Sequence, residues 1–440
     1  MKKQIKLNVL RILFIISLII SLLLISTTYS KYQEQMDTSY NSTIRRWKMV
    51  VNDKIIREQS SLTEVVEPIL VSSEYVKEGV IVPGSESYFN MDINFAEVDV
   101  PFTVEFTLEQ EESSDTYNKL PDFKFYGYYV EENDTFYYNL PEEYQQVEYI
   151  ESSGTQYIDT NIVADSNNIE TIIKFEPKSI TGNMWLGGSD AADVTVIEKD
   201  NTETEEEGDV ITETIINGKT FNSLPYIENN IMKFYAGTSE NIYSEEIELS
   251  KWYKVFQKYD EKTIEIFIND EDAYKYSGTF NGTIENGENL WLFANNSKAN
   301  DFGYSSIRVK EFKYIINDLV SMDLVPCYRK ADNVIGMYDM VTGTFFTNSG
   351  TGTFAKGEDV KKVIIDPNLE KYEDLTDEEK VTNVKAYIRW ADGDGTAASV
   401  IDEMDNVADT NFIIDLRNTH VRYKATAVFE QYIKEYSNSN

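Results

Sequence analysis

Alternation of apolar and polar residues runs through much of the chain and predicts β-strands. Segments 47–52, 88–95 and 123–130 alternate around aromatic residues. Residues 98–108 alternate most regularly, with one apolar face made of Val98, Val100, Phe102, Val104, Phe106 and Leu108. A period of two is typical of antiparallel strands with one face on a core. We therefore expect a strand over residues 98–108 and an all-β fold.

Short alternating segments continue in the middle of the chain. They occupy residues 169–175, 184–188, 232–236, 252–259, 263–268, 273–280, 290–294 and 306–314. Many short strands separated by turns are typical of a two-sheet jelly roll. Residues 194–224 interrupt this pattern and contain the acidic run DNTETEEEGD at 200–209, which we expect to be a solvated loop.

Strands are expected again near the end of the chain, at residues 362–365, 384–390, 412–417 and 422–430. Between them, Thr376 and Glu379 have the spacing of a capping box that opens a short helix.

The strands before residue 139 and after residue 357 are too few in each part to bury a core alone, and open sheet edges are costly. We therefore expect residues 44–138 and 358–434 to close one discontinuous outer β-sandwich. Residues 139–357 would be a jelly roll inserted at a surface hairpin, where insertions are tolerated.

The first 30 residues have the pattern of an export signal. Basic residues at the start precede an apolar run at 12–25, which has the length of a signal-peptide core. Thr28 and Ser30 supply small residues before a cleavage site after Ser30. The alternative is an uncleaved N-terminal membrane anchor. Either reading predicts a secreted or cell-surface protein, in which residues 31–43 form a polar arm.

Charge and residue counts exclude several functions. The 440-residue chain has a net charge of -36 and would repel the phosphate backbone, so nucleic acid is not an expected partner. Cys327 is the only cysteine, so no intrachain disulfide can form. His420 is the only histidine, which rules out multi-histidine zinc sites, and no G-x-S-x-G motif accompanies it. Residues 245–248 lack the carboxylate pattern of a glucanase strand, and we expect no enzymatic activity.

One acidic segment suggests a calcium site. Asp392, Asp394 and Glu403 fit positions one, three and twelve of an EF-hand loop. Ala397 stands where that loop needs glycine, and no flanking helices are evident. The alternative is a solvated acidic loop that binds no metal. Apart from this Ca²⁺, no cofactor is expected.

Trp185, Trp252 and Trp291 are the candidates for stacking on sugar rings. Each lies in an apolar alternating segment, where packing in the core is the favoured interpretation. The sequence leaves the ligand-binding residues unassigned.

Two longer motifs carry a resemblance. LPEEYQQVEYIESSGTQYIDT at 140–160 and LVPCYRKADNVIGMYDMVTGTFFTNSGTGTFAK at 324–356 resemble the borders of laminin-G/concanavalin-like jelly-roll modules of bacterial and phage surface proteins. The resemblance covers nearly all of residues 140–357. It implies a two-sheet jelly roll that serves as a binding module.

The flanking parts resemble a different family. The segments TYSKY at 28–32, VPGS at 82–85 and VKAYIRWADGDGTAASVIDEMDN at 384–406, together with Trp47, are similar to the exported TasA/camelysin family of biofilm-matrix β-sandwiches. This implies a structural protein of the cell surface or extracellular matrix that displays the module, with self-assembly through the arm at 31–43. The alternative is a monomeric adhesin or lectin that binds a glycan or a surface protein through the jelly roll.

Overall fold

The computed structural model describes residues 46–57, 61–70, 80–81, 85–114, 123–163, 168–189, 194–198, 214–218, 224–235, 242–260, 263–269, 273–279, 288–296, 303–316, 319–390, 414–415 and 421–432. Within these ranges the chain is almost entirely β-strand, with two short 3-10 helices, η1 (Glu131–Asn133) and η2 (Glu370–Tyr372). The prediction of an all-β chain is therefore confirmed. The same ranges contain no helix that is long and apolar enough to cross a bilayer. The signal segment, the arm at 31–43, His420 and the predicted site residues Ser30, Asp392, Asp394 and Glu403 lie outside them.

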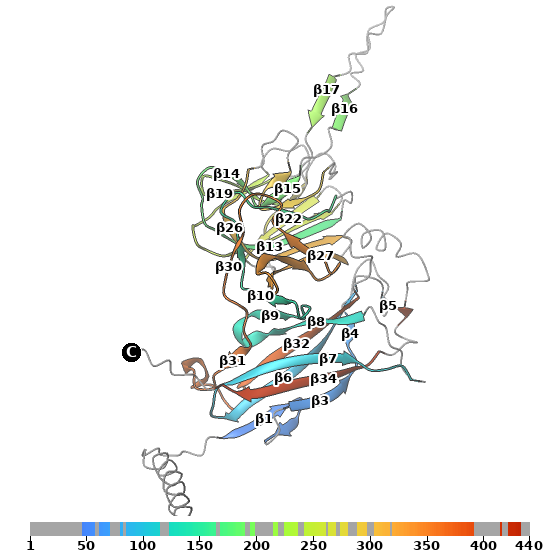
Figure 1. Cartoon of the computed structure of the whole chain (residues 1–440), viewed down its shortest axis with the longest axis vertical. Helices are drawn as coiled ribbons and strands as arrows, with labels where there is room; N and C mark the ends of the chain where they lie inside the picture. Colours follow the sequence, from blue (N-terminus) through green and yellow to red (C-terminus); the bar gives the residue numbers. More distant parts are fainter. Residues whose placement is uncertain are drawn as a thin grey trace, which may run out of the picture.

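Two sheets in the lower part of Figure 1 combine strands from both ends of the chain. The first has the order β2-β1-β6-β32-β8-β9, with β4 also on β6. Its strands are β1 (Trp47–Val51), β2 (Lys54–Ile56), β4 (Ile69–Leu70), β6 (Glu86–Val98), β8 (Phe123–Val130), β9 (Thr135–Tyr138) and β32 (Val381–Trp390). The second, of order β3-β34-β7-β31, consists of β3 (Ser61–Val66), β7 (Phe102–Gln110), β31 (Val363–Ile365) and β34 (Tyr423–Gln431). The short strands β5 (Val80–Ile81) and β33 (Ile414–Asp415) pair with each other.

The core between these two sheets draws on both ends of the sequence. Phe95 of β6 and Phe102 of β7 are completely buried, as are Ala386 of β32 and Ala425 of β34, and all four belong to one hydrophobic cluster. The long pairing of β6 with β32 runs from Val381 opposite Asn94 to Arg389 opposite Glu86. Strands from either side of the middle segment therefore depend on each other for burial. The exact domain boundaries at residues 139 and 357 stay a prediction.

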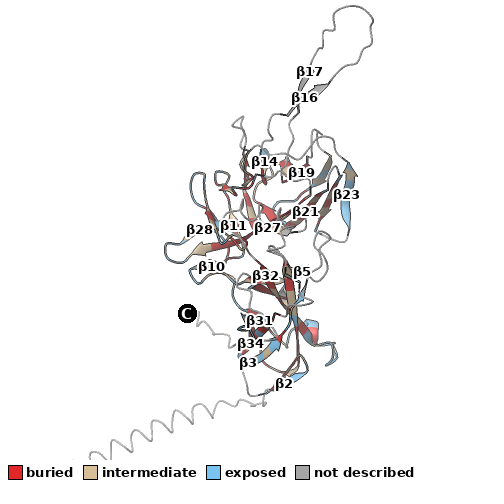
Figure 2. Cartoon of the chain, turned by 90° about the vertical axis from the view of Figure 1, so that its right-hand side faces the viewer, coloured by how far each residue is buried: buried red, intermediate tan, exposed pale blue. Residues whose placement is uncertain are grey.

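The middle segment forms the upper part of Figure 1 around a separate hydrophobic cluster. Its large sheet has the order β23-β22-β21-β13-β26-β27-β28-β29, with β10 on β27, and with β11 on both β26 and β30. The strands are β10 (Tyr144–Gln146), β11 (Ile150–Glu151), β13 (Ile169–Pro177), β21 (Tyr253–Asp260), β22 (Thr263–Ile268), β23 (Tyr274–Thr279), β26 (Ile307–Ile316), β27 (Leu319–Arg329), β28 (Val334–Asp339), β29 (Phe345–Thr347) and β30 (Ala355–Lys356). Buried positions gather on its inner strands, whereas β23 lies at the exposed edge (Figure 2).

Smaller sheets complete the upper part. One has the order β12-β24-β15-β25 and the other β14-β18-β19-β20. Their strands are β12 (Ile158–Asp159), β14 (Asn183–Trp185), β15 (Gly187–Ser189), β18 (Tyr226–Glu228), β19 (Ile231–Phe234), β20 (Tyr243–Glu246), β24 (Trp291–Leu292) and β25 (Asn295–Asn296). Ile158, Leu292, Ile227 and Phe234 bury their side chains in the same cluster as the large sheet. The arrangement is a sandwich with one large and one divided layer.

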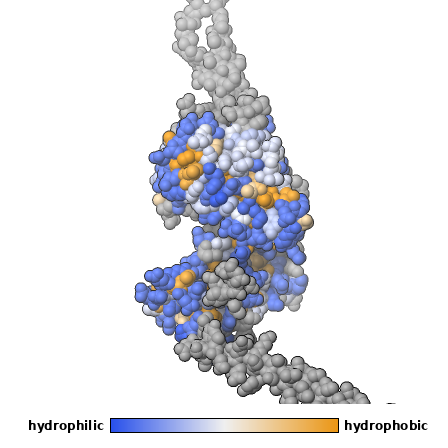
Figure 3. Space-filling view, turned by 60° about the vertical axis from the view of Figure 1, so that its left-hand side comes forward, coloured by the Kyte–Doolittle hydropathy of each residue, from blue (hydrophilic) through white to orange (hydrophobic). Residues whose placement is uncertain are grey.

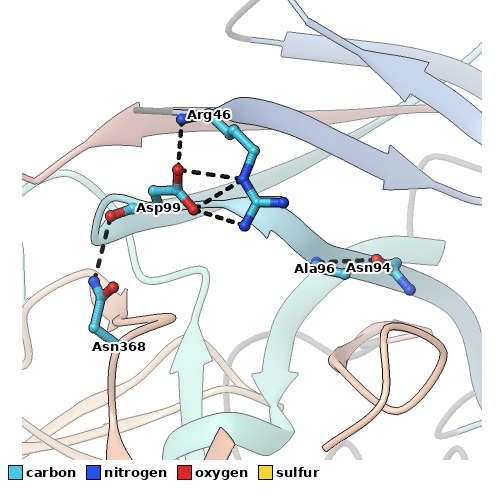
Figure 4. Close-up of polar contacts among 5 residues, drawn as sticks. All are labelled: Arg46, Asn94, Ala96, Asp99 and Asn368. Carbon is cyan, nitrogen blue, oxygen red and sulfur yellow. Dashed lines mark hydrogen bonds and ion pairs between the residues drawn. The ribbon is translucent and has the colours of Figure 1, made fainter. Parts of the chain in front are cut away.

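The expected strand over residues 98–108 is confirmed only from Phe102 onward. β6 ends at Val98 and β7 begins at Phe102, because Pro101 has no N–H for the ladder and the chain turns there. Asp99 holds this corner (Figure 4): its carboxylate accepts hydrogen bonds from the backbone N of Arg46 at 2.8 Å and from its Nη2 at 2.9 Å. Asn368 Nδ2 donates to the Asp99 carbonyl at 3.4 Å. The corner thus joins the start of β1 to the loop after β31.

The expected helix after Thr376 is wrong. Glu379 does accept the capping-box hydrogen bonds, from the backbone N of Thr376 at 2.9 Å and its hydroxyl at 2.8 Å. However, β32 begins at Val381 and pairs at once with β6, so only one turn forms. The tertiary pairing overrides the local signal.

Residues 194–224, which interrupt the alternating pattern, contain two strands. β16 (Val194–Glu198) pairs antiparallel with β17 (Thr214–Gly218), and the pair projects from the top of Figure 1. The acidic run 200–209 lies outside the described residues.

The two chain crossings between the lower and upper parts run side by side. The backbone N of Glu148 donates to the Glu358 carbonyl at 2.9 Å, and the backbone N of Val360 donates to the Gln146 carbonyl at 2.9 Å. The Gln146 side chain also accepts from the backbone N of Tyr138 at 3.0 Å. The crossings are therefore paired with each other and tied to β9.

A buried polar network joins β8 and β32 of the lower part to β26 and β27 of the upper part. The Tyr126 hydroxyl donates to the Asp323 carboxylate, which also lies 3.2 Å from Lys313 Nζ. The Arg389 guanidinium donates to the Val320 carbonyl. Asp323 is 0% exposed and Arg389 is 1% exposed. Buried ions are tolerated only with partners, so this network fixes how the two parts meet.

Asp339 supports the network from behind. Its Oδ1 accepts hydrogen bonds from the backbone N of Asp323 at 2.9 Å and of Val341 at 3.1 Å, and its Oδ2 accepts from the Thr342 hydroxyl at 2.7 Å. Burial outweighs these bonds and raises the pKa of Asp339 from 3.8 to about 6.

We predict that Asp323→Ala lowers the free energy of unfolding by about 3 kcal/mol, because Lys313 and Tyr126 lose their buried partner. Urea unfolding of the whole chain measures this. The control is Asp332→Ala, which removes the 2.7 Å ion pair with Arg329 on the surface and should have a much smaller effect. Equal losses in the two variants would contradict the role assigned to the network.

We predict a specific pH dependence for Asp339. Its folded pKa of about 6 lies above the unfolded value, so the folded chain binds a proton that the unfolded chain releases between about pH 4 and 6. Stability from this group is complete below that range and is lost as pH rises through 6. The stability difference between wild type and Asp339→Asn should therefore slope across pH 4–6 and be flat above pH 7. A slope confined to other pH values would refute the assignment.

Candidate functional site

The outer face of the two small sheets carries a group of aromatic side chains. The alternation places Met184, Leu186 and Leu292 in the core and turns Trp185 and Trp291 outward, where both are half-buried. The expectation that these tryptophans pack in the core is therefore wrong, and Trp252 is half-buried as well. Half-buried aromatic rings on one face suit stacking on a ligand.

Tyr157 and Trp291 form the centre of this group. Their rings stack with centroids 3.9 Å apart and planes at 23°. The pairing of β12 with β24 sets this contact, because Asp159 stands opposite Trp291 and the preceding turn brings Tyr157 beside the indole. The ring centroid of Tyr304 lies 6.2 Å from that of Tyr157, so Tyr304 extends the aromatic surface.

A second aromatic trio adjoins the first. Trp185 lies 4.6 Å from Tyr226 and 6.2 Å from Tyr235, measured between ring centroids. The backbone N of Trp185 donates to the Gly303 carbonyl at 2.7 Å, and a Cβ at Gly303 would lie 2.4 Å from Cδ1 of Trp185. Glycine thus lets the Trp185 indole lie against the chain directly before Tyr304.

Polar groups border the stacked pair. Asp159 Oδ1 accepts hydrogen bonds from Asn289 Nδ2 at 3.1 Å and from the backbone N of Asn161 at 3.0 Å. Asn296 Nδ2 donates to the Asn289 carbonyl at 2.9 Å. On the other neighbouring strand Gly188 stands opposite Trp291, so that position adds no side chain over the indole. The site combines flat apolar rings with amide and carboxylate groups that can hydrogen-bond hydroxyls.

The two sequence motifs meet beneath Tyr157. The Tyr157 backbone N donates to Asn348 Oδ1 at 3.2 Å, and the Ser349 backbone N donates to the Tyr157 carbonyl at 2.9 Å. The buried Gln156 side chain accepts from the Ser153 backbone N at 2.8 Å and donates to the Thr351 carbonyl at 3.2 Å. The SSGTQY and NSGTG segments therefore act as a scaffold that fixes the outward tyrosine.

The charge state of the site favours neutral ligands. Partial burial, followed by the nearby Tyr304 and Asp159, raises the pKa of Tyr157. The phenol is therefore a neutral donor at physiological pH. No group of three or more His, Cys, Asp or Glu side chains in the described ranges is placed to hold a metal ion. The calcium site at Asp392, Asp394 and Glu403 lies outside those ranges and stays a prediction.

Sequence reasoning named Trp185 and Trp291 but missed Tyr157, Asp159 and Tyr304. The outward direction of the Trp185 side chain could have been predicted from the apolar residues on either side of it, Met184 and Leu186. Two-residue strands such as β12 and β24 show no period, so the sequence had no comparable signal for the others.

Comparison with known proteins gives distant structural likenesses. No family model and no curated protein matches the chain. A candidate carbohydrate-binding protein from Bacteroides ovatus is similar over 66% of this chain and 95% of its own, with 10% identity and a TM-score of 0.31. A heptameric SAP-like pentraxin from Limulus polyphemus is similar over 59% of this chain and 95% of its own, with 10% identity and a TM-score of 0.26. A third likeness is to domain 4 of the extracellular arabinanase AbnA from Geobacillus stearothermophilus, in complex with arabinotriose. It extends over 42% of this chain and 92% of that domain, with 12% identity and a TM-score of 0.20.

We predict that Trp291→Ala and its neighbour Leu292→Ala differ sharply in stability. Leu292 is 0% exposed, so truncating it should cost about 2–5 kcal/mol, whereas Trp291→Ala removes a half-buried ring that stacks on Tyr157 and should cost less. Urea unfolding of both variants measures the difference. A larger loss in Trp291→Ala would place the indole in the core and remove the site.

Proposed function

We propose that the middle segment is a carbohydrate-binding module that uses the Tyr157–Trp291 face. The observation that carries the proposal is the outward stacked pair with Asp159 and Asn289 at its border. The apolar face of a sugar ring stacks on an aromatic side chain, and its hydroxyls bond to carboxylate and amide groups. The adjoining Trp185 and Tyr226 rings would hold a second sugar unit of the same chain.

The charge of the protein supports sugar over nucleic acid as the ligand. Aromatic rings also stack on bases, but a net charge of -36 opposes a phosphate backbone. A neutral glycan has no such penalty.

We propose binding without cleavage. A glycosidase needs two carboxylates that face each other across the sugar bond. Asp159 accepts hydrogen bonds from Asn289 and Asn161, and Glu228 on the neighbouring sheet is held in an ion pair with Lys233. Both carboxylates are engaged in holding the face together.

We further propose that the lower sheets carry this module at the cell surface or in an extracellular matrix. This part of the proposal rests on the N-terminal export pattern and on the resemblance to the TasA/camelysin family. The buried network around Asp323 supports it, because the module is fixed to its carrier rather than tethered. Self-assembly through the arm at 31–43 and the alternative of a monomeric adhesin both stay predictions.

Screening the full-length protein on a glycan array tests the function, followed by titration calorimetry with the best glycan. We expect Trp291→Ala and Tyr157→Ala to weaken binding about tenfold or more, since each removes a stacking surface. Trp252→Ala is the matched control, because this half-buried tryptophan precedes β21 of the large sheet and should leave the affinity unchanged. An EDTA arm tests whether calcium contributes. Binding that survives both Trp291→Ala and Tyr157→Ala would overturn the proposed site.

A further inference from the structure

A cavity of about 340 Å³ lies where the lower and upper parts meet. One wall is the β8–β9 hairpin and the chain crossings, and the other is the outer face of the large sheet. The surface is indented at this junction (Figure 3). The side chains that matter for its chemistry are those of Tyr129, Asp134, Glu148, Lys174, Lys254, Lys310, Glu311 and Lys313.

A β-bulge directs one of these lysines. Along the pairing of β13 with β26, Lys174 faces Glu311 and Phe175 faces Val309, so Lys310 is an extra residue without a partner in the ladder. Bulges of this kind re-aim a side chain and are frequent beside functional sites. The Lys310 ammonium lies 4.4 Å from the Trp252 ring centroid.

The lysines here repel one another. Lys174 stands directly opposite Lys254 on the neighbouring strand, an arrangement that destabilises a sheet. Burial and then the charge of Lys174 lower the pKa of Lys310. Lys258, also on β21, stands opposite Glu170 and forms an ion pair with it at 2.8 Å, which is how a cross-strand lysine is usually accommodated.

Lys174 and Lys310 differ from Lys313, which also lines the cavity. In the part of the chain that the structure describes, neither makes an ion pair within 4.0 Å. By contrast, Lys313 is paired with Asp323 at 3.2 Å and lies 3.9 Å from Glu311. Lys310 lies over the Trp252 ring, and among the described residues neither it nor Lys174 has a carboxylate partner, so both ammonium groups can take an anionic group.

The acidic residues of the cavity narrow the choice of ligand. Asp134 accepts a hydrogen bond from the Tyr129 hydroxyl at 3.0 Å, and Glu311 is close to Lys313. Glu148 adds a carboxylate at the wall formed by the chain crossings. Carboxylates repel a polyanion but accept hydrogen bonds from hydroxyls. The lining therefore suits a ligand with one anionic group and several hydroxyls.

We propose that this cavity binds a sugar acid, whose carboxylate is held by Lys174 and Lys310 and whose hydroxyls face Glu148. The volume is at the lower end of the range for small-molecule sites, which suits one sugar unit. Ion-assisted hydrogen bonds to two ammonium groups would provide most of the affinity. This site is separate from the Tyr157–Trp291 face, which suits neutral rings.

Titration calorimetry of the full-length protein with glucuronate, glucose and inorganic phosphate tests the proposal. We expect glucuronate to bind, glucose to bind at least tenfold more weakly, and phosphate to bind more weakly than glucuronate. Lys174→Gln and Lys310→Gln should each weaken glucuronate binding about tenfold or more, and the control Lys258→Gln should not. The proposal would be overturned if glucose or phosphate bound with the same affinity as glucuronate. It would also be overturned if both lysine variants bound glucuronate as tightly as the wild type.

Thermal unfolding without ligand provides the second readout. Lys174→Gln should leave the melting temperature unchanged or raise it, because the repulsion from Lys254 and Lys310 is relieved. A clear fall would show that Lys174 is structural and would sink the idea. Glucuronate binding should persist in Trp291→Ala, so that failure of the aromatic face and failure of this cavity are told apart.

Discussion

The arrangement of the molecule depends on one buried carboxylate. This carboxylate, that of Asp323, accepts a hydrogen bond from the Tyr126 hydroxyl of the lower part and forms an ion pair with Lys313 on the neighbouring strand. The backbone N of Asp323 donates a hydrogen bond to Asp339. A charge that is 0% exposed is stable only while these partners stay in place. The relative position of the two parts is therefore set chemically as well as by packing. The cavity between them exists because this position is fixed.

The large sheet of the middle segment has two different faces with two different uses. Its inner face supplies Phe175, Val255 and Phe312 to the core, all 0% exposed. Its outer face presents Lys174 and Lys310 toward the lower part. The small sheets divide their residues in the same way, with Leu292 inside and Trp291 outside. Alternation of side chains thus builds the core and the aromatic face, while a bulge adds Lys310 to the cavity.

The sequence predicted the all-β class and most of the longer strands, because periods of two persist over β13, β21 and β32. It missed the break that Pro101 makes in a regular alternation, and at the capping box of Thr376 a local signal lost to tertiary pairing. The sites were harder still. Lys174 and Lys254 come together only through the pairing of β13 with β21, and the lysine bulge on β26 shows in no local pattern. Such contacts depend on strand register between distant segments, which periodicity cannot supply.

The paired crossings at residues 146–148 and 358–360 have a mechanical consequence. The middle segment enters and leaves the lower part at neighbouring points that are hydrogen-bonded to each other. Tension applied through β1 and β34 therefore passes through the lower sheets, which contain both of these strands. The middle segment is bypassed until the crossings separate. The aromatic side chains around Tyr157 and Trp291 lie on this bypassed segment.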